Sequence, residues 1–522
     1  MKRQQAGLGL AVLMSMCTLS LTSTFCLADD PDYGPQDAIE PPIITYPETG
    51  AHFLASSAIT TSCTPGYDLD CNKVTGQPDV TDSVTHVWSG CSSDFPNGNI
   101  GTTVVYHCRD DQGGDWLQVI CNDDWDDPYN AALCDEDAGV STVVEFSALV
   151  PYVEQIDFSG TNNYAMMDDS DPPVEITDPE YVRSTARNEP ACQQMGESVT
   201  FTEVTFTSDN GDLDEAESVK VWASGAVDGL DFPDTDDSWQ NWPSSGITMT
   251  SSEDLDDCVH KAADFWEFWY YRVPTGTNDA VPMYYEGPHT TEHVVYVVLD
   301  EPQAPQATPW QKVLDEACDV GSPAALESTA TYFMWLELYF CVGGSYDTEW
   351  GAHAYTTNGT TGYFKLKSWL NALPNVGTVN CYDMAKALVV YANAVGCHTS
   401  NTYVIPFGYL NCIRPIGKGW TNNPFYDNEQ YDDDPIVNGD WDEDDGRSGF
   451  GNHAFARLSG DIYDASGGQV DVDGTPDAAP HTSRSLDGDD TWTDDYRDRV
   501  IDDDPASSPG TPTPYAFSVA NE

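Results

Sequence analysis

Three residues in the C-terminal part of the chain have the types and the order that thiol chemistry requires. Cys381 follows Asn380, His453 lies 72 residues later, and Asp464 follows after another 11 residues. In such chemistry a thiolate attacks a carbonyl carbon, an imidazole takes and returns the proton, and a carboxylate fixes the imidazole tautomer. We therefore treat Cys381, His453 and Asp464 as a candidate nucleophile, base and orienting carboxylate.

The residues from 380 to 395 predict a helix that begins next to the candidate nucleophile. Apolar side chains recur there at spacings of three and four, so we expect one face of the helix to pack inward. Gly396 is a natural stop, and Asn380 is a favoured N-cap residue, which places Cys381 on the first turn. At that position the unpaired backbone N–H groups and the helix dipole favour the thiolate. The same N–H groups can donate to an oxyanion. A buried, inert thiol is the alternative for a cysteine taken alone.

The segment around His453 predicts two strands joined by a tight turn at 459–461. Alternation places His453, Phe455 and Arg457 on one face of the first strand, and Asp464 lies at the end of the second. We therefore expect His453 and Asp464 to be neighbours across the two strands. An ordinary hairpin with a core histidine and a turn carboxylate is the alternative.

Sequence motifs around these residues resemble the transglutaminase-like (transglutaminase core) family. The resemblance spans 306–505 and implies a papain-like α+β domain in which Cys381 is the nucleophile, His453 the base and Asp464 the orienting residue. The matching residues are Cys381-Tyr382-Asp383-Met384-Ala385, Leu388, Gly396, His453-Ala454-Phe455 and Tyr463-Asp464. The chain departs from the family at Val379, where glycine is common, and at Phe455, where tryptophan is common.

The resemblance implies an exported cysteine enzyme that acts on protein or peptide amide bonds through a thioester, with hydrolysis favoured over crosslinking. The alternative is a surface binding or adhesion protein whose transglutaminase-like unit is a catalytically silent scaffold. No cofactor is expected. Zinc is not favoured, because no paired C-x-x-C or H-x-x-x-H spacing accompanies the three residues. His353 and His398 have no partner motif and are interpreted as structural or surface residues.

The charge of the chain excludes some partners. Acidic residues number 87 against 20 basic ones, and the formal net charge is −67. Nucleic acid is therefore an unfavourable partner, because the long-range field repels it. The Asp-rich loops at 432–434 and 442–445 are interpreted as solvated surface, with calcium binding as the alternative. A third acidic stretch, at 471–477, lacks the glutamate of a complete calcium loop and is interpreted as a turn.

The beginning of the chain predicts export. Residues 1–28 carry basic residues, an apolar stretch and a small-residue exit, as in a cleaved signal peptide, so we expect a secreted, cell-surface or periplasmic protein. No later stretch is long and apolar enough for a membrane span. Removing the signal leaves thirteen cysteines, and setting Cys381 aside leaves twelve, which can form six disulfides. Plausible local pairs are Cys397 with Cys412 and Cys318 with Cys341.

The remaining pattern predicts a multidomain chain in which β-sandwich-like domains precede the α+β domain. A linker is expected at 29–50, a disulfide-rich β-domain at 51–140 and a second β-rich domain at 141–305. Trp88 and Tyr106, which stands two residues before Cys108, weakly resemble the immunoglobulin arrangement. The aromatic run at 265–271 is interpreted as core rather than as a carbohydrate platform, and 506–522 as a frayed tail.

Overall fold

The computed structural model describes the side chains of the C-terminal two thirds of the chain and only backbone strands before residue 150. The described residues are 151–520, except 159, 161, 209–216, 226–227, 273–288, 430–447, 473–482 and 503–507. The predicted signal peptide, the side chains of the first β-domain and the Asp-rich loops at 432–434 and 442–445 lie outside them. The boundaries of the predicted domains stay predictions.

Seven strands are described before residue 150, and they form two sheets, in the orders β1-β3-β5 and β2-β7-β6-β4. The strand-forming runs around Trp88 and Tyr106 do form strands, and these two residues belong to different sheets, on β4 and β5. The strands are β1 (Ile44–Tyr46), β2 (His52–Leu54), β3 (Ala58–Cys63), β4 (Val84–Gly90), β5 (Thr103–His107), β6 (Gly113–Asp123) and β7 (Val140–Leu149).

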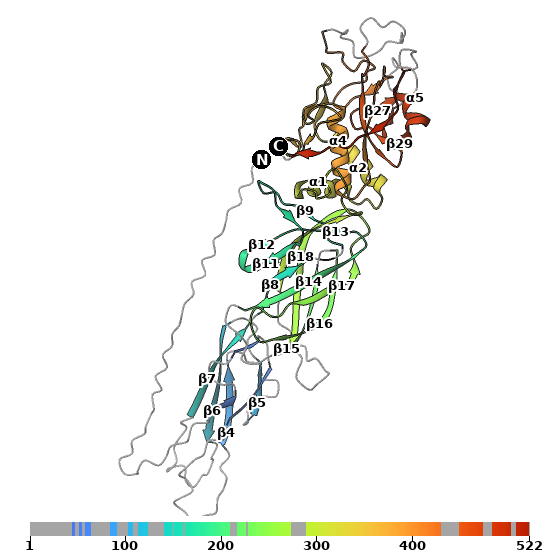
Figure 1. Ribbon diagram of the computed structural model, residues 1–522. Helices are drawn as coiled ribbons and strands as arrows, with labels where there is room; N and C mark the ends of the chain where they lie inside the picture. Colours follow the sequence, from blue (N-terminus) through green and yellow to red (C-terminus); the bar gives the residue numbers. More distant parts are fainter. Residues whose placement is uncertain are drawn as a thin grey trace, which may run out of the picture.

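Two five-stranded sheets follow, in the orders β12-β11-β8-β14-β17 and β13-β19-β18-β15-β16. Apolar residues from both sheets form one buried cluster, with the sheets lying between the N-terminal strands and the helices in Figure 1. The strands are β8 (Tyr152–Asp157), β11 (Glu180–Val182), β12 (Arg187–Asn188), β13 (Ala191–Gln194), β14 (Ser198–Thr207), β15 (Glu217–Gly225), β16 (Asp231–Trp239), β17 (Ile247–Asp254), β18 (His260–Arg272) and β19 (His289–Val298). A hairpin of β9 (Met166–Met167) and β10 (Glu175–Ile176) lies beside them. The β-rich, multidomain character expected from the sequence is present.

The aromatic run falls on β18 and divides by alternation, because successive side chains of a strand point to opposite faces. Trp266 and Phe268 are buried between the sheets, in agreement with the core interpretation. Phe265 points outward and is 38% exposed, and Trp269 stacks on Trp222 of β15 with ring centroids 5.3 Å apart. The core interpretation therefore holds for only one face of the strand.

The helix predicted over 380–395 is present as α4, and four further helices are described. The helices are α1 (Gln311–Gly321), α2 (Glu327–Phe340), α3 (Leu366–Ala372) and α4 (Cys381–Ala394), with a short α5 (Arg497–Val500) near the end of the chain. The expectation that α4 buries one face is wrong, because every residue of this helix is buried. A sheet covers one side of α4 and the helices α1 and α2 cover another. Spacing alone did not show this, because the remaining positions are filled largely by small or apolar residues such as Ala385 and Val389.

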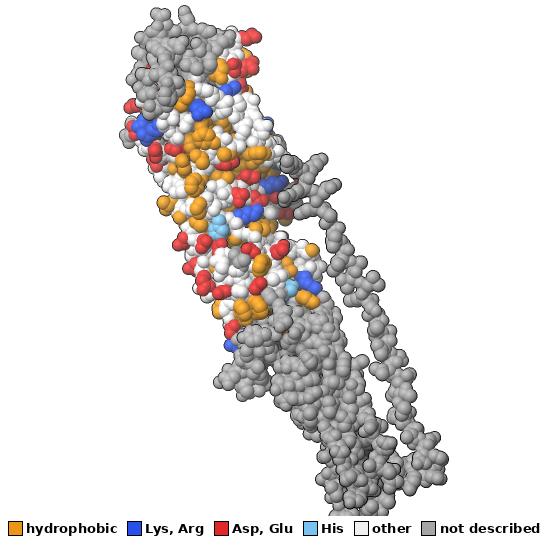
Figure 2. All heavy atoms as spheres, turned by 180° about the vertical axis from the view of Figure 1, so that it is seen from behind, with side chains coloured by type: hydrophobic (Ala, Val, Ile, Leu, Met, Phe, Trp, Pro, Cys, Tyr) orange, Lys and Arg blue, Asp and Glu red, His pale blue; other side chains and the backbone are white. Residues whose placement is uncertain are grey.

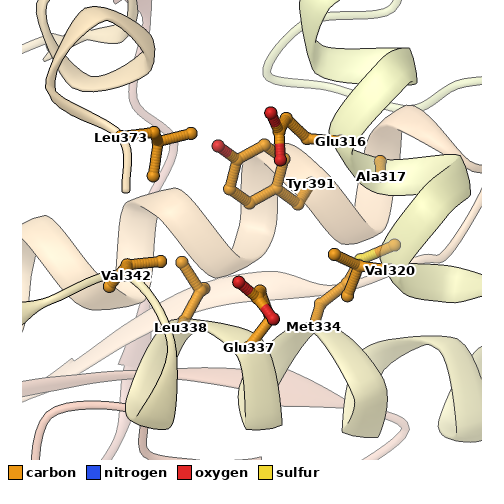
Figure 3. Close-up of a pocket in the computed structure, with 9 residues that line it drawn as sticks. All are labelled: Glu316, Ala317, Val320, Met334, Glu337, Leu338, Val342, Leu373 and Tyr391. Atoms are coloured by element: carbon orange, nitrogen blue, oxygen red, sulfur yellow. The ribbon is translucent and has the colours of Figure 1, made fainter. Parts of the chain in front are cut away.

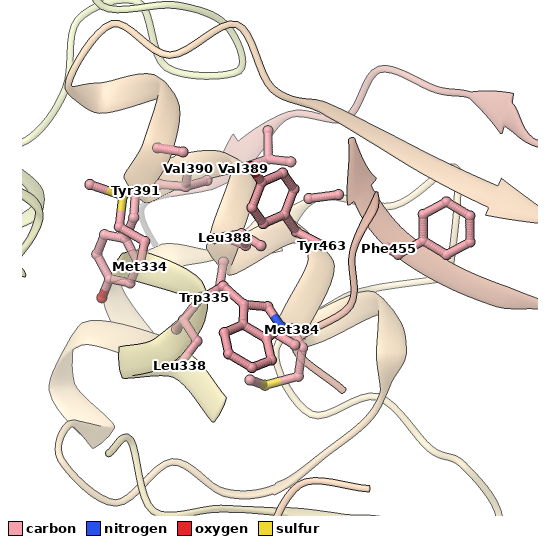
Figure 4. Packing of buried hydrophobic residues seen from close by; sticks show 14 of the residues in the cluster. Met334, Trp335, Leu338, Met384, Leu388, Val389, Val390, Tyr391, Phe455 and Tyr463 are labelled. Atoms are coloured by element: carbon pink, nitrogen blue, oxygen red, sulfur yellow. The ribbon is translucent and has the colours of Figure 1, made fainter. Parts of the chain in front are cut away.

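The sheet beside α4 has the order β29-β26-β25-β23-β30, and each pair of neighbouring strands is antiparallel. Figure 4 shows Met384 and Leu388 of α4 close to Trp335 of α2 and Tyr463 of the sheet, while Phe455, a member of the same buried cluster, lies farther from α4. Its strands are β23 (Ser400–Val404), β25 (His453–Leu458), β26 (Asp461–Tyr463), β29 (Asp487–Thr491) and β30 (Thr513–Pro514). Smaller sheets contain β20 (Gly344–Tyr346) with β22 (Gly377–Val379), β21 (Phe364–Lys365) with β31 (Val519–Ala520), and β24 (Ile413–Arg414) with β27 (Gln469–Asp471) and β28 (Ser483–Ser485).

The sandwich and the helical part share a core. Tyr296 and Val298 of β19 lie in the same buried cluster as Leu314 of α1. At the edge of this junction, Asp315 accepts hydrogen bonds from the Tyr296 hydroxyl and the Lys261 ammonium, each at 2.6 Å. Helix α1 is therefore held by apolar packing and the Tyr296 hydrogen bond to β19, and by the charged contact of Lys261 to β18.

The cysteine pairs expected from sequence proximity are wrong. The seven cysteines among the described residues form no disulfide. Cys318 is buried on α1, whereas Cys341 is exposed at the end of α2. The Cys397 thiol points to the carbonyl oxygen of Glu327 at 3.6 Å rather than to Cys412. Proximity along the chain did not predict which side of each element these side chains would occupy.

The surface carries the expected acidic excess. Acidic side chains are spread over the described part of the face in Figure 2, with basic ones scattered between them. Within the described residues, no helix is long and apolar enough to cross a membrane.

Candidate active site

Cys381 is the first residue of α4, and a capping box fixes this end of the helix. The Asn380 side chain accepts hydrogen bonds from the backbone N–H of Tyr382 at 3.0 Å and of Asp383 at 3.1 Å. The Asp383 carboxylate in turn accepts from the backbone N–H of Asn380 at 3.3 Å. The cap therefore uses the second and third N–H groups of the helix and leaves that of Cys381 without an acceptor among the described residues. The backbone N–H of Cys381 is thus the first-turn donor that can bind the oxyanion formed when the sulfur attacks a carbonyl carbon.

His453 begins β25 and is held by aromatic rings. It is 2% exposed, its ring stacks on Phe450 with centroids 5.1 Å apart, and Phe407 lies at 4.7 Å. Its Nε2 atom lies 2.7 Å from an oxygen of Asp464. The Nδ1 atom has no partner of ordinary hydrogen-bond geometry among the described residues, yet Cys381 is close enough to raise the pKa of the imidazole. Asp464 and Cys381 therefore both act on the same imidazole.

Asp464 follows β26 and is anchored through both oxygens. One oxygen accepts hydrogen bonds from the backbone N–H of Ser466 and Gly467, at 3.0 and 2.9 Å, and from the Ser466 hydroxyl at 2.8 Å. The other faces His453 and also accepts from the Tyr496 hydroxyl at 2.7 Å. This network fixes the position of the carboxylate before any substrate arrives. The contact between His453 and Asp464 that the sequence predicts is present.

The charges of this pair stabilise each other inside the protein. Burial by itself lowers the pKa of His453, but the charge and hydrogen bond of Asp464 outweigh it and raise the pKa to about 10. Burial raises the pKa of Asp464, and His453 together with the surrounding donors outweighs that effect and lowers it to about 2. The site therefore favours an imidazolium beside a carboxylate at neutral pH.

Tyr346 is a neighbour of Cys381 that the sequence analysis missed. It lies on β20 opposite Val379 of β22, two residues before the nucleophile, and is 3% exposed. Burial first, and then Cys381 itself, raise the pKa of Tyr346 well above its ordinary value, so the hydroxyl lies close to the Cys381 thiol. The hydroxyl therefore remains a proton donor beside the sulfur. A lone tyrosine 35 residues upstream gave no signal in the sequence, because only the pairing of β20 with β22 brings it close.

The other candidate residues lie apart from this cluster or carry no sign of a site. His398 forms an ion pair with Glu327 at 3.3 Å and is 55% exposed, and His353 is also exposed. Within the described ranges, no group of three or more His, Cys, Asp or Glu residues is placed to hold a metal ion.

A cavity beside the later part of α4 does not belong to the candidate site. It has a volume of about 20 Å³ and is lined by Glu316 of α1, Glu337 of α2 and Tyr391 of α4, as Figure 3 shows. Tyr391 lies ten residues beyond Cys381, which is about 15 Å along a helix axis. Such a cavity is large enough for a single water molecule.

Comparisons with known proteins give structural likenesses only. No family model matches the chain, and no curated protein matches it. The fibronectin(III)-like modules of CbhA from Clostridium thermocellum are 12% identical, with 49% of this chain and 92% of theirs covered and a TM-score of 0.15. The adhesin InvE of Yersinia pseudotuberculosis is 8% identical over 51% of this chain and 62% of its own, at a TM-score of 0.17. Red sea bream transglutaminase is 8% identical over 54% of this chain and 50% of its own, at a TM-score of 0.25. At these TM-scores the likenesses carry no functional weight.

Proposed function

We propose that the chain is an exported thiol acyl-transfer enzyme of the transglutaminase-like kind, which acts on protein or peptide amide bonds. One observation carries the proposal: the Nε2 atom of His453 lies 2.7 Å from a fixed carboxylate, and Cys381 is close enough to the same imidazole to raise its pKa. A nucleophile, a base and an orienting group then form one chain of contacts, which an ordinary core histidine does not need.

Acylation uses the residues as follows. The Cys381 sulfur, with its proton on His453, attacks the amide carbonyl carbon, and the carbonyl electrons move to the oxygen. The N–H of Cys381 stabilises the oxyanion, and the Tyr346 hydroxyl is a second donor close to the sulfur. The oxyanion then collapses, the C–N bond breaks, and the leaving amine takes the proton from His453. A thioester on Cys381 remains.

Deacylation reverses the proton movements. Water or an amine gives a proton to His453 and attacks the thioester carbonyl carbon. The C–S bond breaks, and the Cys381 sulfur leaves as a thiolate that the imidazolium stabilises again. Water yields a carboxylic acid and an amine yields a new amide. We favour water, so the product is a hydrolysed peptide or a deamidated side chain.

The test is amide hydrolysis by the purified chain, compared with Cys381→Ser. Denatured casein serves as a general protein substrate, with mass spectrometry to detect new termini and deamidated side chains and an ammonia assay to count released amide groups. A fluorescent primary amine added in parallel detects transfer. Product formation that requires Cys381 supports the proposal. Equal amounts of product from both chains would favour the binding-protein alternative. The same holds if neither chain forms product and the Cys381 thiol has ordinary reactivity.

A further inference from the structure

Residues 508–520 run back over the region of Cys381, and the expectation of a frayed tail is wrong for them. β30 pairs with Thr402 and Tyr403 at the edge of β23, and β31 pairs with Phe364 and Lys365 of β21. The backbone N–H of Tyr515, between the two pairings, donates to Asn401 at 3.0 Å. The segment therefore has a defined path, from the edge of β23 to β21.

Tyr515 is the part of this segment that covers the candidate nucleophile. It packs against the small buried cluster that contains Cys381, Tyr382 and Ala454. Its ring lies edge-on to Tyr382 and to Tyr403, with centroids 6.5 and 5.3 Å apart. Cys381 is only 4% exposed in this arrangement, so an acyl substrate has no direct approach to the sulfur.

A buried lysine of α4 supports the same segment. The Lys386 ammonium donates to the carbonyl oxygens of Gly359 and Gly362, at 2.8 and 3.0 Å. It also lies over the rings of Tyr515 and Phe517, 5.9 and 5.2 Å from their centroids. A cation held over an aromatic ring is attracted by the ring electrons. This contact holds the two aromatic side chains of the segment against the helix that carries Cys381.

The attachments are short compared with those of the core. Each strand pairing of the segment has two residue pairs, whereas β23 and β25 pair over five residues. The backbone of β30 lies at the sheet edge, and the side chains of Thr513 and Pro514 are exposed. Segments with few buried contacts open at a lower free energy than core strands. Opening here would uncover the edge of β23 without disturbing β25 or α4.

We propose that residues 508–520 form a strap that closes the acyl-substrate site over Cys381, and that an extended peptide substrate enters only when the strap leaves the edge of β23. An edge strand accepts an extended peptide through its backbone groups, and the strap occupies that position now. The proposal rests on the proposed function, because it concerns access to the same sulfur.

The test is the rate at which a bulky maleimide and the smaller iodoacetamide modify Cys381, followed by peptide mass spectrometry. Tyr515→Ala removes the covering ring, and Thr513→Ala is the matched control, because it truncates an exposed side chain of the same segment. We expect Tyr515→Ala to accelerate the maleimide reaction by about tenfold or more and Thr513→Ala to change it by less than about twofold. The gain should be smaller for iodoacetamide.

Equal maleimide rates in the wild-type and Tyr515→Ala chains overturn the strap. The absolute rate at pH 5.5 tests the proposed function separately, because only an activated thiol reacts quickly at that pH. Equal and fast rates support an activated Cys381, and equal and slow rates count against it. A second measurement needs no variant. Hydrogen exchange of 508–520 should speed up in the wild-type chain once Cys381 carries the bulky group, and unchanged protection contradicts the proposal.

Discussion

Replacing Asp464 by asparagine removes the negative charge beside His453 while keeping the size of the side chain. The amide oxygen can still accept from the N–H groups of Ser466 and Gly467. The contact to His453 and the hydrogen bond from Tyr496 lose their acceptor. The substitution therefore separates the charge of the orienting residue from its role in holding the loop.

The structure sets the size of the effect. Burial lowers the pKa of His453, and Asp464, with a further contribution from Cys381, outweighs burial and raises the pKa to about 10. Without the carboxylate, the largest influence that raises the pKa of His453 is lost while burial still lowers it, so the pKa should fall from about 10. Each unit of that fall lowers the equilibrium constant for proton transfer from Cys381 to His453 about tenfold. The population of thiolate and imidazolium falls with it.

Alkylation of Cys381 by iodoacetamide measures that population without a known substrate. We expect the alkylation rate at pH 6 to fall by about tenfold or more in Asp464→Asn. Reactivity should return only as the pH approaches the pKa of an ordinary thiol. Asp490→Asn is the control, because Asp490 is a buried carboxylate whose partners are Arg484 and Arg499 rather than His453. An Asp464→Asn profile that overlays the wild-type profile would refute the reasoning.

Three further predictions follow from the same contacts. Asn380→Ala should lower the free energy of unfolding by about 1–2 kcal/mol in a denaturant titration, because two N–H groups lose their cap; no change would show that the cap is not needed. Tyr346→Phe should lower kcat, with a smaller change in KM and a nearly unchanged thermal midpoint. A loss of stability without a change in kcat would show that the hydroxyl has only a structural role. The ion pair of His453 and Asp464 should make the stability of the wild-type chain depend on pH at both ends of the range. Stability should fall as the pH rises from about 6.5 through about 10, because the raised pKa of His453 contributes fully only below about 6.5. It should also fall as the pH drops from about 3.8 through about 2, because the Asp464 carboxylate, whose pKa is lowered, then becomes protonated. Denaturant midpoints that Asp464→Asn leaves unchanged at pH 4–6 would contradict it.

Local sequence signals predicted the elements around the site well. Asn380 followed by a helical pattern gave the beginning of α4, and alternation with a turn at 459–461 gave β25 and β26. Ser459 and Gly460 both adopt positive φ there, which allows the two-residue turn that joins the strands. These features depend on residues close together in the chain, so the sequence contains them directly.

Long-range features were not predictable in the same way. Tyr346 reaches Cys381 only through the parallel pairing of β20 with β22, and Tyr515 does so through a strand added at the sheet edge. A short polar segment rich in Pro and Thr has the composition of a frayed end, and nothing local indicates a free sheet edge elsewhere. The cysteine pairs failed for a related reason, because Cys341 faces solvent and Cys318 faces the core.

The central claim is that Cys381 is an activated thiol, and competition with another cysteine of the same chain tests it directly. Cys341 is exposed, and burial of part of the thiol together with Glu337 raises its pKa, so it is an accessible reference thiol that is not activated. With a limiting amount of iodoacetamide at pH 5.5, we predict that Cys381 is labelled before Cys341 in Tyr515→Ala and in the wild-type chain, although Cys381 is far more buried. Labelling of Cys341 before Cys381 in both chains would contradict the account.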